Sequence, residues 1–427
     1  MQIQIKNIGT IKEANVNLDG LSVIAGGNDS GKSTVSKIVF SVIKAFQRYK
    51  YDFNISKEQI LEEKINDLYR NIRFRIFKDR EKGNDVSLNK ILKEDFYPPI
   101  FLNELSVFGG VDIFKIKEEK INTLLLDLKD KKLLIKLLII IKEEFLKDEK
   151  KEDLIKIALD NILKSEFENQ LNNEKLGKKG TIELRESNII LFKIIIEKNK
   201  VSEVQINDDI LKIKDTTFID SPMTLNLYNY LNNRRIIPGI RNKELQFHIK
   251  DLFSKIGESK FDEEKTNKII ASIENIVKGV FKIVKKGYKE YLVFSKNGIE
   301  LDTINTATGI KSFGLLDLLD KANSLESDDL LILDEPEVHL HPEWQVRYAE
   351  LIVTLIKERG LSVLITSHSP YMIEALSKFS KNEDKVKASF YLAEESKKGG
   401  FDINNKTNKK YEIFEKLSKP FRDLMLK

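Results

Sequence analysis

The first part of the chain alternates apolar and polar residues with the period of β-strands. Residues 1–25 carry this pattern between turn signals and end in the apolar run 21–25. From residue 34 to about residue 49, apolar residues recur instead at helical spacing. The pattern therefore predicts a small sheet whose last strand leads through a glycine-rich loop directly into a helix.

The long segment 50–175 has a different pattern, with Leu and Ile at helical spacing among many Lys and Glu residues. Glycine almost disappears after Val111, which favours continuous helices. No sustained heptad repeat supports a long coiled coil. The Lys and Glu runs are typical of solvated helix faces, and a nucleic-acid or partner surface is the alternative.

Strand patterns return after residue 180, with β-branched runs through 181–213. Helical patterns occupy about 243–285, and a hairpin follows around the Asn297-Gly298 turn. The segment 218–222 predicts a strand that ends in a turn, to which the sequence assigns no chemical role. The whole pattern predicts an α/β fold, in which a mixed or parallel sheet with flanking helices carries a long, mainly helical insert.

We expect one sheet domain built from two stretches of the chain, because strand patterns flank the helical segment on both sides. The chain of 427 residues, 41% of them hydrophobic, is long enough and apolar enough for such a globular core. The expected boundaries are 1–49 and 180–395 for the sheet domain, 50–179 for the helical insert, and 396–427 for a C-terminal tail that packs on the sheet domain.

Charge and composition exclude several classes of function. The 72 basic and 67 acidic side chains nearly cancel to a formal +5, a balance that neither demands nor excludes a nucleic-acid partner. The absence of cysteine excludes disulfides, thiol catalysis and cysteine zinc sites. No signal-peptide pattern is visible, and the most apolar stretch, 133–141, is shorter than the roughly 20 residues of a membrane span. We expect a cytoplasmic protein without a membrane partner.

The glycine-rich loop carries the clearest chemical signal in the chain. Residues 26–34 fit the pattern G-x-x-x-x-G-K-[ST] between an apolar strand and an amphipathic helix, which is the context of a phosphate-binding P-loop. In such a loop, Lys32 reaches the β- and γ-phosphates of ATP and the Ser33 hydroxyl binds Mg²⁺. ATP and Mg²⁺ are therefore the predicted ligands. The residues expected at the nucleotide are Gly26, Gly27, Asn28, Asp29, Ser30, Gly31, Lys32, Ser33 and Thr34.

Two adjacent acids end a second apolar run, 330–333. A parallel sheet would bring them beside the first loop. Asp334 is then expected to hold Mg²⁺ through its water shell, while Glu335, which points the other way by strand alternation, orients and deprotonates the attacking water. The alternative is an ordinary pair of acids at the end of a strand.

A third apolar run, 361–367, ends at His368. Its imidazole would emerge at the same sheet edge as Asp334 and contact the γ-phosphate, although a strand-end histidine can also be purely structural. The predicted catalytic set is therefore Lys32, Glu335 and His368.

Three segments together carry a family resemblance: 26–34, 334–342 and 366–370. They resemble the ABC-type ATPases of the OLD (overcoming lysogenization defect) group, which is related to RecF and SMC clamp ATPases and includes ATPase subunits of antiphage systems such as Septu and PARIS. The motifs cover residues 1–48 and 300–375 in detail. The resemblance implies an ABC-type P-loop NTPase fold and an enzyme that hydrolyses ATP to ADP and phosphate.

The resemblance also implies that a second copy of the chain closes the ATP site with a signature loop. The matching segment is 305–311, where Thr308 and Gly309 stand at the family's Ser-Gly position and Lys311 stands near its usual Gln. This segment departs from the usual L-S-G-G-Q form. A homodimer or higher homo-oligomer is the implied assembly. The loop glutamine that often contacts Mg²⁺ in ABC proteins has no recognisable counterpart in the sequence.

At the level of biological role, the resemblance implies an ATPase subunit of a bacterial antiphage defence complex. Full OLD proteins carry a Toprim nuclease domain, and residues 369–427 are too few for one. A separate effector, expected to be a nuclease, would then be the controlled partner. The alternative is a DNA-repair or chromosome-maintenance ATPase that resembles RecF or SMC and binds DNA directly.

Two further clusters allow more than one interpretation. His339 and His341 could join a metal site, but their segment resembles the loop that crosses to the opposite subunit in ABC dimers, so an interface role is favoured. Arg234, Arg235 and Arg241 could contact nucleic-acid phosphates, although a short basic cluster is usually a solvated or salt-bridged face.

Overall fold

The computed structural model describes most of the chain, in two compact units. The sheet unit comprises Met1–Gln47 and Ile155–Lys427, and the inserted unit comprises Arg48–Leu154. The inserted unit begins at Arg48, two residues before the segment 50–179 that was expected as the helical insert, and the residues from Ile155 onward belong to the sheet unit. The described residues are 1–78, 86–108, 111–124, 126–147, 150–172, 176–187, 189–207, 211–232, 245–258, 267–287 and 289–425.

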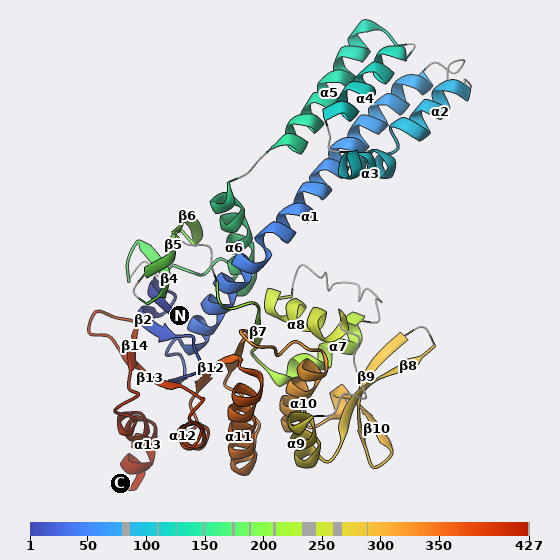
Figure 1. The fold of residues 1–427 in the computed structure, drawn as a ribbon. Helices are drawn as coiled ribbons and strands as arrows, with labels where there is room; N and C mark the ends of the chain where they lie inside the picture. Colours follow the sequence, from blue (N-terminus) through green and yellow to red (C-terminus); the bar gives the residue numbers. More distant parts are fainter. Residues whose placement is uncertain are drawn as a thin grey trace. The chain divides into compact units, whose positions relative to one another are not determined.

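An eleven-stranded mixed sheet organises the sheet unit (Figure 1). Neighbouring strands from β13 through β3, β12 and β11 to β7 are parallel, whereas β6, β5, β4, β1 and β2 pair antiparallel. Strand β14 joins these two parts, parallel to β2 and antiparallel to β13. In order across the sheet, the strands are β6 (Lys200–Ile206), β5 (Ile189–Glu197), β4 (Lys179–Glu186), β1 (Gln2–Ile8), β2 (Ile11–Asn17), β14 (Phe401–Asn405), β13 (Ala388–Glu395), β3 (Leu21–Ala25), β12 (Ser362–Ser367), β11 (Leu330–Asp334) and β7 (Thr216–Ile219).

Helices and a second sheet complete the sheet unit. A three-stranded sheet has the order β10 (Ile299–Asp302), β9 (Lys289–Lys296) and β8 (Val280–Lys286). Helix α6 (Lys151–Phe167) begins in the inserted unit and continues into the sheet unit. The later described helices are α7 (Leu225–Asn232), α8 (Phe247–Glu258), α9 (Lys268–Val277), α10 (Thr308–Lys321), α11 (Pro342–Arg359), α12 (Pro370–Lys381) and α13 (Tyr411–Met425), with short 3₁₀ turns at Pro222–Thr224 and Thr303–Asn305.

One sequence prediction in this region is wrong. The helical pattern expected through about residue 285 stops at α9, and β8 follows as a strand. The helix ends because its C-cap residue, Lys278, adopts a left-handed conformation (φ 55°) directly before Gly279. The next residues are aromatic and β-branched, and Phe281 is buried against Phe294 of β9 with ring centroids 5.1 Å apart.

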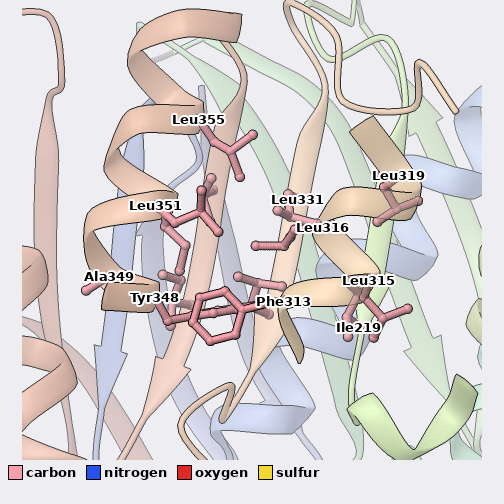
Figure 2. Close-up of a cluster of buried hydrophobic side chains, with 14 of the residues drawn as sticks. Ile219, Phe313, Leu315, Leu316, Leu319, Leu331, Tyr348, Ala349, Leu351 and Leu355 are labelled. Carbon is pink, nitrogen blue, oxygen red and sulfur yellow. The ribbon is translucent and has the colours of Figure 1, made fainter. Parts of the chain in front are cut away.

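The main core lies between the parallel strands and helices α10 and α11 (Figure 2). Phe313 of α10 packs edge-on against Tyr348 of α11, with ring centroids 5.0 Å apart. Leu331 of β11 and Leu316 of α10 are buried in the same cluster. Burial of each such side chain stabilises the fold by about 1.5–3 kcal/mol, so this layer fixes β11 and the acids at its end.

Helix α1 (Lys32–Lys78) begins in the sheet unit and continues into the inserted unit. On the opposite side of β7 from the α10 layer, Phe40 of α1 packs against Phe218 with ring centroids 5.9 Å apart. The helix is much longer than the stretch to residue 49 that the sequence predicted, because its apolar stripe continues and is buried inside the inserted unit.

The inserted unit is helical, as predicted, with α2 (Val86–Asp95), α3 (Pro98–Phe108), α4 (Val111–Thr123) and α5 (Leu128–Leu146) beside the second part of α1. Residues Leu61, Ile65, Leu68 and Ile72 of α1 recur at helical spacing and are buried in its core. No described helix has an apolar stretch long enough to cross a bilayer. The mixed sheet, its flanking helices and the helical inserted unit confirm the predicted α/β fold.

The contact of α10 with the three-stranded sheet gives a stability prediction. A Cβ atom on Gly314 would lie 2.1 Å from the Phe281 ring, so Gly314→Ala should lower the free energy of unfolding by about 1–3 kcal/mol in urea denaturation. In a Phe281→Leu background the added cost should shrink. Gly257→Ala in α8 is the control, because its Cβ would meet only the Tyr228 hydroxyl at 3.9 Å. An unchanged stability of Gly314→Ala would contradict this packing.

Candidate functional site

The carboxyl ends of four neighbouring parallel strands meet at one edge of the sheet. Strands β3, β12, β11 and β7 lead into Gly26, His368, Glu335 and Asp220, respectively. A cavity of about 440 Å³ opens at this edge. Its lining residues are Thr10, Asn28, Asp29, Ser30, Gly31, Lys32, Ser33, Thr34, Asp220, Ser221, Pro222, Asp334, Glu335, Val338 and His368. The structure therefore brings the three predicted motifs together.

The glycine-rich loop wraps back on itself before α1 begins. The Lys32 ammonium donates to the Gly27 carbonyl at 2.7 Å, and the Ser30 hydroxyl donates to the same oxygen at 2.7 Å. Gly31 has a φ of +80°, and a Cβ there would lie 2.3 Å from Ile11 of β2, so only glycine fits without strain. This packing leaves the first residues of α1, including Ser33, at the cavity.

Asp334 and Ser33 offer oxygen ligands of the kind that Mg²⁺ prefers. Burial raises the pKa of the Asp334 carboxyl, although hydrogen bonds from the Ser33 and Thr366 hydroxyls oppose the shift. A bound divalent cation would favour the ionised form. A carboxylate and a hydroxyl that already share a hydrogen bond at the end of the phosphate loop fit a magnesium site.

Glu335 turns into the cavity because the chain leaves the strand at this residue. Its φ of 45° is left-handed, and its N–H donates to the Thr366 carbonyl at 3.0 Å. This turn, and not the alternation of a continuing strand, orients the carboxylate. Oε1 lies 3.2 Å from the Lys32 ammonium and Oε2 lies 3.3 Å from Nδ1 of His368. Such a non-glycine conformation costs about 1–3 kcal/mol and is typical of functional sites.

Glu337 holds the loop that carries His368, and the sequence analysis did not identify it. Its side chain is buried, and Oε1 accepts three hydrogen bonds: from the Ser367 hydroxyl at 2.7 Å, the His368 N–H at 2.8 Å and the Ser369 N–H at 3.1 Å. The carboxylate thus connects the loop after β11 to the loop after β12. No sequence signal separates Glu337 from a surface acid, because its partners lie about thirty residues away.

Asp220 is a second cavity residue that the sequence analysis missed. It follows β7, which is paired parallel to β11 with Ile219 opposite Leu333. Its side chain therefore reaches the same edge as Asp334 and Glu335 and lines the cavity. The signal was present in the sequence, because an apolar strand that ends in an acid is the same pattern that identified Asp334.

The predicted signature residues lie apart from these groups. Thr308 is the first residue of α10, and its N-cap, Ala307, makes no side-chain hydrogen bond to the helix. Gly309 packs against Leu340 and Trp344. Lys311 is buried and its ammonium donates to Asn226 at 2.7 Å. None of the three predicted residues lines the cavity formed by the described part of the chain.

The two histidines in the loop before α11 are exposed. His341 is the N-cap of α11, and its Nδ1 accepts from the Glu343 N–H at 3.4 Å. Within the described residues, no group of three or more His, Asp or Glu side chains is placed to bind a metal ion together. The predicted basic cluster of Arg234, Arg235 and Arg241 lies outside the described residues.

The profile of a protein family described as "AAA ATPase domain" matches residues 1–373. No curated protein matches the sequence. Among solved structures, an SmcHead bound to the C-winged helix domain of ScpA is similar, with 11% identity, a TM-score of 0.43 and coverage of 96% of this chain and 98% of that chain. The SMC head domain from Thermotoga maritima has 10% identity, a TM-score of 0.39 and coverage of 95% and 97%. An Smc head domain with an extended coiled coil, bound to the C-terminal domain of ScpA derived from Pyrococcus furiosus, has 9% identity, a TM-score of 0.33 and coverage of 97% and 98%.

The Glu337 contacts predict a graded loss of stability. Glu337→Ala removes the acceptor of one hydroxyl and two backbone N–H groups and should lower the free energy of unfolding by about 3 kcal/mol. Glu337→Gln keeps Oε1 and should lose about half as much, because a neutral acceptor makes weaker hydrogen bonds. Urea denaturation followed by circular dichroism measures both. Equal losses for the two variants would show that the three contacts do not act through Oε1.

Proposed function

This chain belongs to the AAA ATPase domain family, and we propose that it binds ATP with Mg²⁺ in the cavity at the sheet edge and hydrolyses it to ADP and phosphate. One observation carries the proposal: Lys32, Asp334, Glu335 and His368 come from three separate parts of the sequence and meet around one cavity. A phosphate loop, a cation-binding acid and a second acid next to a histidine are the parts that nucleotide hydrolysis needs.

Each side chain has a distinct task in the proposed reaction. Lys32 exchanges its contacts with Gly27 and Glu335 for phosphate oxygens, since all of these partners compete for the same ammonium. Ser33 and Asp334 would hold Mg²⁺, which when bound neutralises phosphate charge. Glu335, released from Lys32, accepts the proton of the attacking water. His368 holds the Glu335 carboxylate from the other side at 3.3 Å.

The site is completed by a second copy of the chain in this proposal. Thr308 and Gly309 begin α10 outside the cavity of their own chain, and the N-cap residue, Ala307, makes no side-chain hydrogen bond to this helix terminus. The positive end of a helix can bind a phosphate of a neighbouring subunit. The surface beside it includes the exposed apolar side chains Met223 and Ile304, which a second copy would cover.

A substitution that blocks hydrolysis but not binding tests both parts of this proposal. Glu335→Gln should reduce ATP turnover at least about 100-fold and accumulate an ATP-bound dimer, seen as a doubled mass in light scattering with ATP and Mg²⁺. Lys32→Ala should bind no ATP and keep the mass of the apo protein. Glu358→Gln, an exposed acid on α11, is the matched control and should behave as wild type. Wild-type turnover by Lys32→Ala would refute the proposed site.

At the level of biological role, the proposed activity belongs to an ATPase subunit of a bacterial antiphage defence complex that controls a separate effector nuclease. The support is the OLD-like motif set in residues 26–34, 334–342 and 366–370, whose chemical groups share the cavity edge. Direct action on DNA, as in a RecF- or SMC-like protein, is the alternative that the experiment must separate.

Expression with the neighbouring genes of the native locus separates these two roles. We expect a nuclease to co-purify with this chain, and the Glu335→Gln variant to change the amount retained when ATP is present. The isolated protein has a formal charge of +5, and it should bind duplex DNA only weakly and non-specifically. Tight, steeply salt-dependent duplex binding without any co-purifying protein would favour the DNA-binding role instead.

A further inference from the structure

A chain of three titratable side chains runs from the cavity into the interior of the sheet unit. Nε2 of His248 lies 3.2 Å from Oδ2 of Asp220, which lines the cavity. On its other side, Nδ1 of His248 lies 2.8 Å from Oε2 of Glu166. The backbone N–H of His248 also donates to Oε1 of Glu166 at 2.9 Å. The three residues belong to β7's end, α8 and α6, so the chain joins three elements.

The carboxylates of Asp220 and Glu166 together determine the charge of the histidine. The Glu166 side chain is 0% exposed and His248 is 1% exposed, and a buried carboxylate without a cationic partner would be strongly destabilising. Burial alone would favour the neutral imidazole, but the two carboxylates outweigh it and raise the pKa of His248 to about 9. His248 is therefore an imidazolium, and both of its ring nitrogens carry protons. The Nδ1 proton is hydrogen-bonded to Glu166, whereas Nε2 forms an ion pair with Asp220 but no hydrogen bond.

The imidazolium in turn determines the state of Asp220. Burial favours the neutral acid, but the contact with His248 prevails and holds the pKa of Asp220 below its ordinary value. The Thr224 hydroxyl lies 3.4 Å from the other carboxylate oxygen. Asp220 thus presents a fixed, ionised carboxylate to the cavity. A carboxylate at this position is a hydrogen-bond acceptor, and a water between it and the phosphates is a donor that it can hold.

Glu166, the acid farthest from the cavity in this row of three side chains, lies on helix α6. Glu166 is near the C-terminal end of α6, whose first residues belong to the inserted unit. The Lys37 ammonium of α1 donates to the Glu166 carbonyl at 3.1 Å. Lys37 lies one turn after the phosphate loop. Glu166 therefore connects α6 to two elements of the site: to α1 through Lys37, and to Asp220 through His248.

We propose that His248 is a positioning residue that holds Asp220 toward the water at the phosphates, and that Glu166 makes this position depend on α6. This inference rests on the proposed ATP site and adds a regulatory input to it. A shift of α6 withdraws Glu166 from His248, and Asp220 then loses its orientation while the phosphate loop remains intact. A movement of α6, which begins in the inserted unit, would thereby change the rate of ATP hydrolysis without moving Lys32, Asp334 or Glu335.

Steady-state ATP hydrolysis by Asp220→Asn, His248→Gln and Glu166→Gln tests the proposal. We expect each variant to lose about 10- to 100-fold in kcat with little change in the KM for ATP, because the phosphate loop is untouched. The double variant Asp220→Asn/His248→Gln should be no slower than Asp220→Asn alone, since His248 acts through Asp220. A His248→Gln effect that persists in full in the Asp220→Asn background would show a merely structural histidine and overturn the proposal.

Two controls keep the outcome clear. Lys164→Gln removes a positive charge from an exposed side chain of α6 that does not line the cavity, and it should leave turnover unchanged. If His248→Gln or Glu166→Gln fails to fold, Asp220→Asn decides, because it keeps the buried His248–Glu166 pair. Wild-type turnover by Asp220→Asn would overturn this inference alone. Absence of turnover in the wild-type protein, together with no difference from Lys32→Ala, would instead overturn the proposed function and this inference with it.

Discussion

The parallel pairing of β3, β12, β11 and β7 is the constraint on which the site depends. In this register Ala25 lies opposite Ser367, and Thr366 lies opposite Asp334, so strands far apart in the sequence end at the same level. A shift of one residue in any of these pairs would turn its side chains to the other face. The buried layer formed by α10 and α11 against β11 holds that register, and the position of each chemical group at the edge follows from it.

Charge compensation is the second feature that shapes the site. Lys32 is almost fully buried, and it is stable there because the Gly27 carbonyl and the Glu335 carboxylate surround its ammonium. Glu337 and Glu166 are buried acids, and each accepts hydrogen bonds from a distant segment. Because every one of these ions would be costly if left alone, the contacts favour one arrangement of the loops over many similar ones.

The sequence was sufficient for the parts of the site that local patterns encode. The phosphate loop, the acids after β11 and the histidine after β12 each follow an apolar strand, and topology brings them together as predicted. Asp220 follows the same pattern but lacked a known motif. Glu337, His248 and Glu166 could not be predicted, because their roles depend on partners that only the fold supplies. Strand β8 was missed because the end of α9 depends on the left-handed Lys278, a backbone state that side-chain periodicity does not show.

Strand β14 has a consequence for how the molecule is made. It lies between the antiparallel and the parallel parts of the main sheet and pairs with one strand of each, and its residues are synthesised long after those of β2 and β3. During translation, the backbone groups of β2 and β13 that pair with β14 therefore stay unpaired until residues 401–405 have left the ribosome. Unpaired edges invite association with other chains, so the nascent protein passes through a period in which chaperone protection has most to contribute.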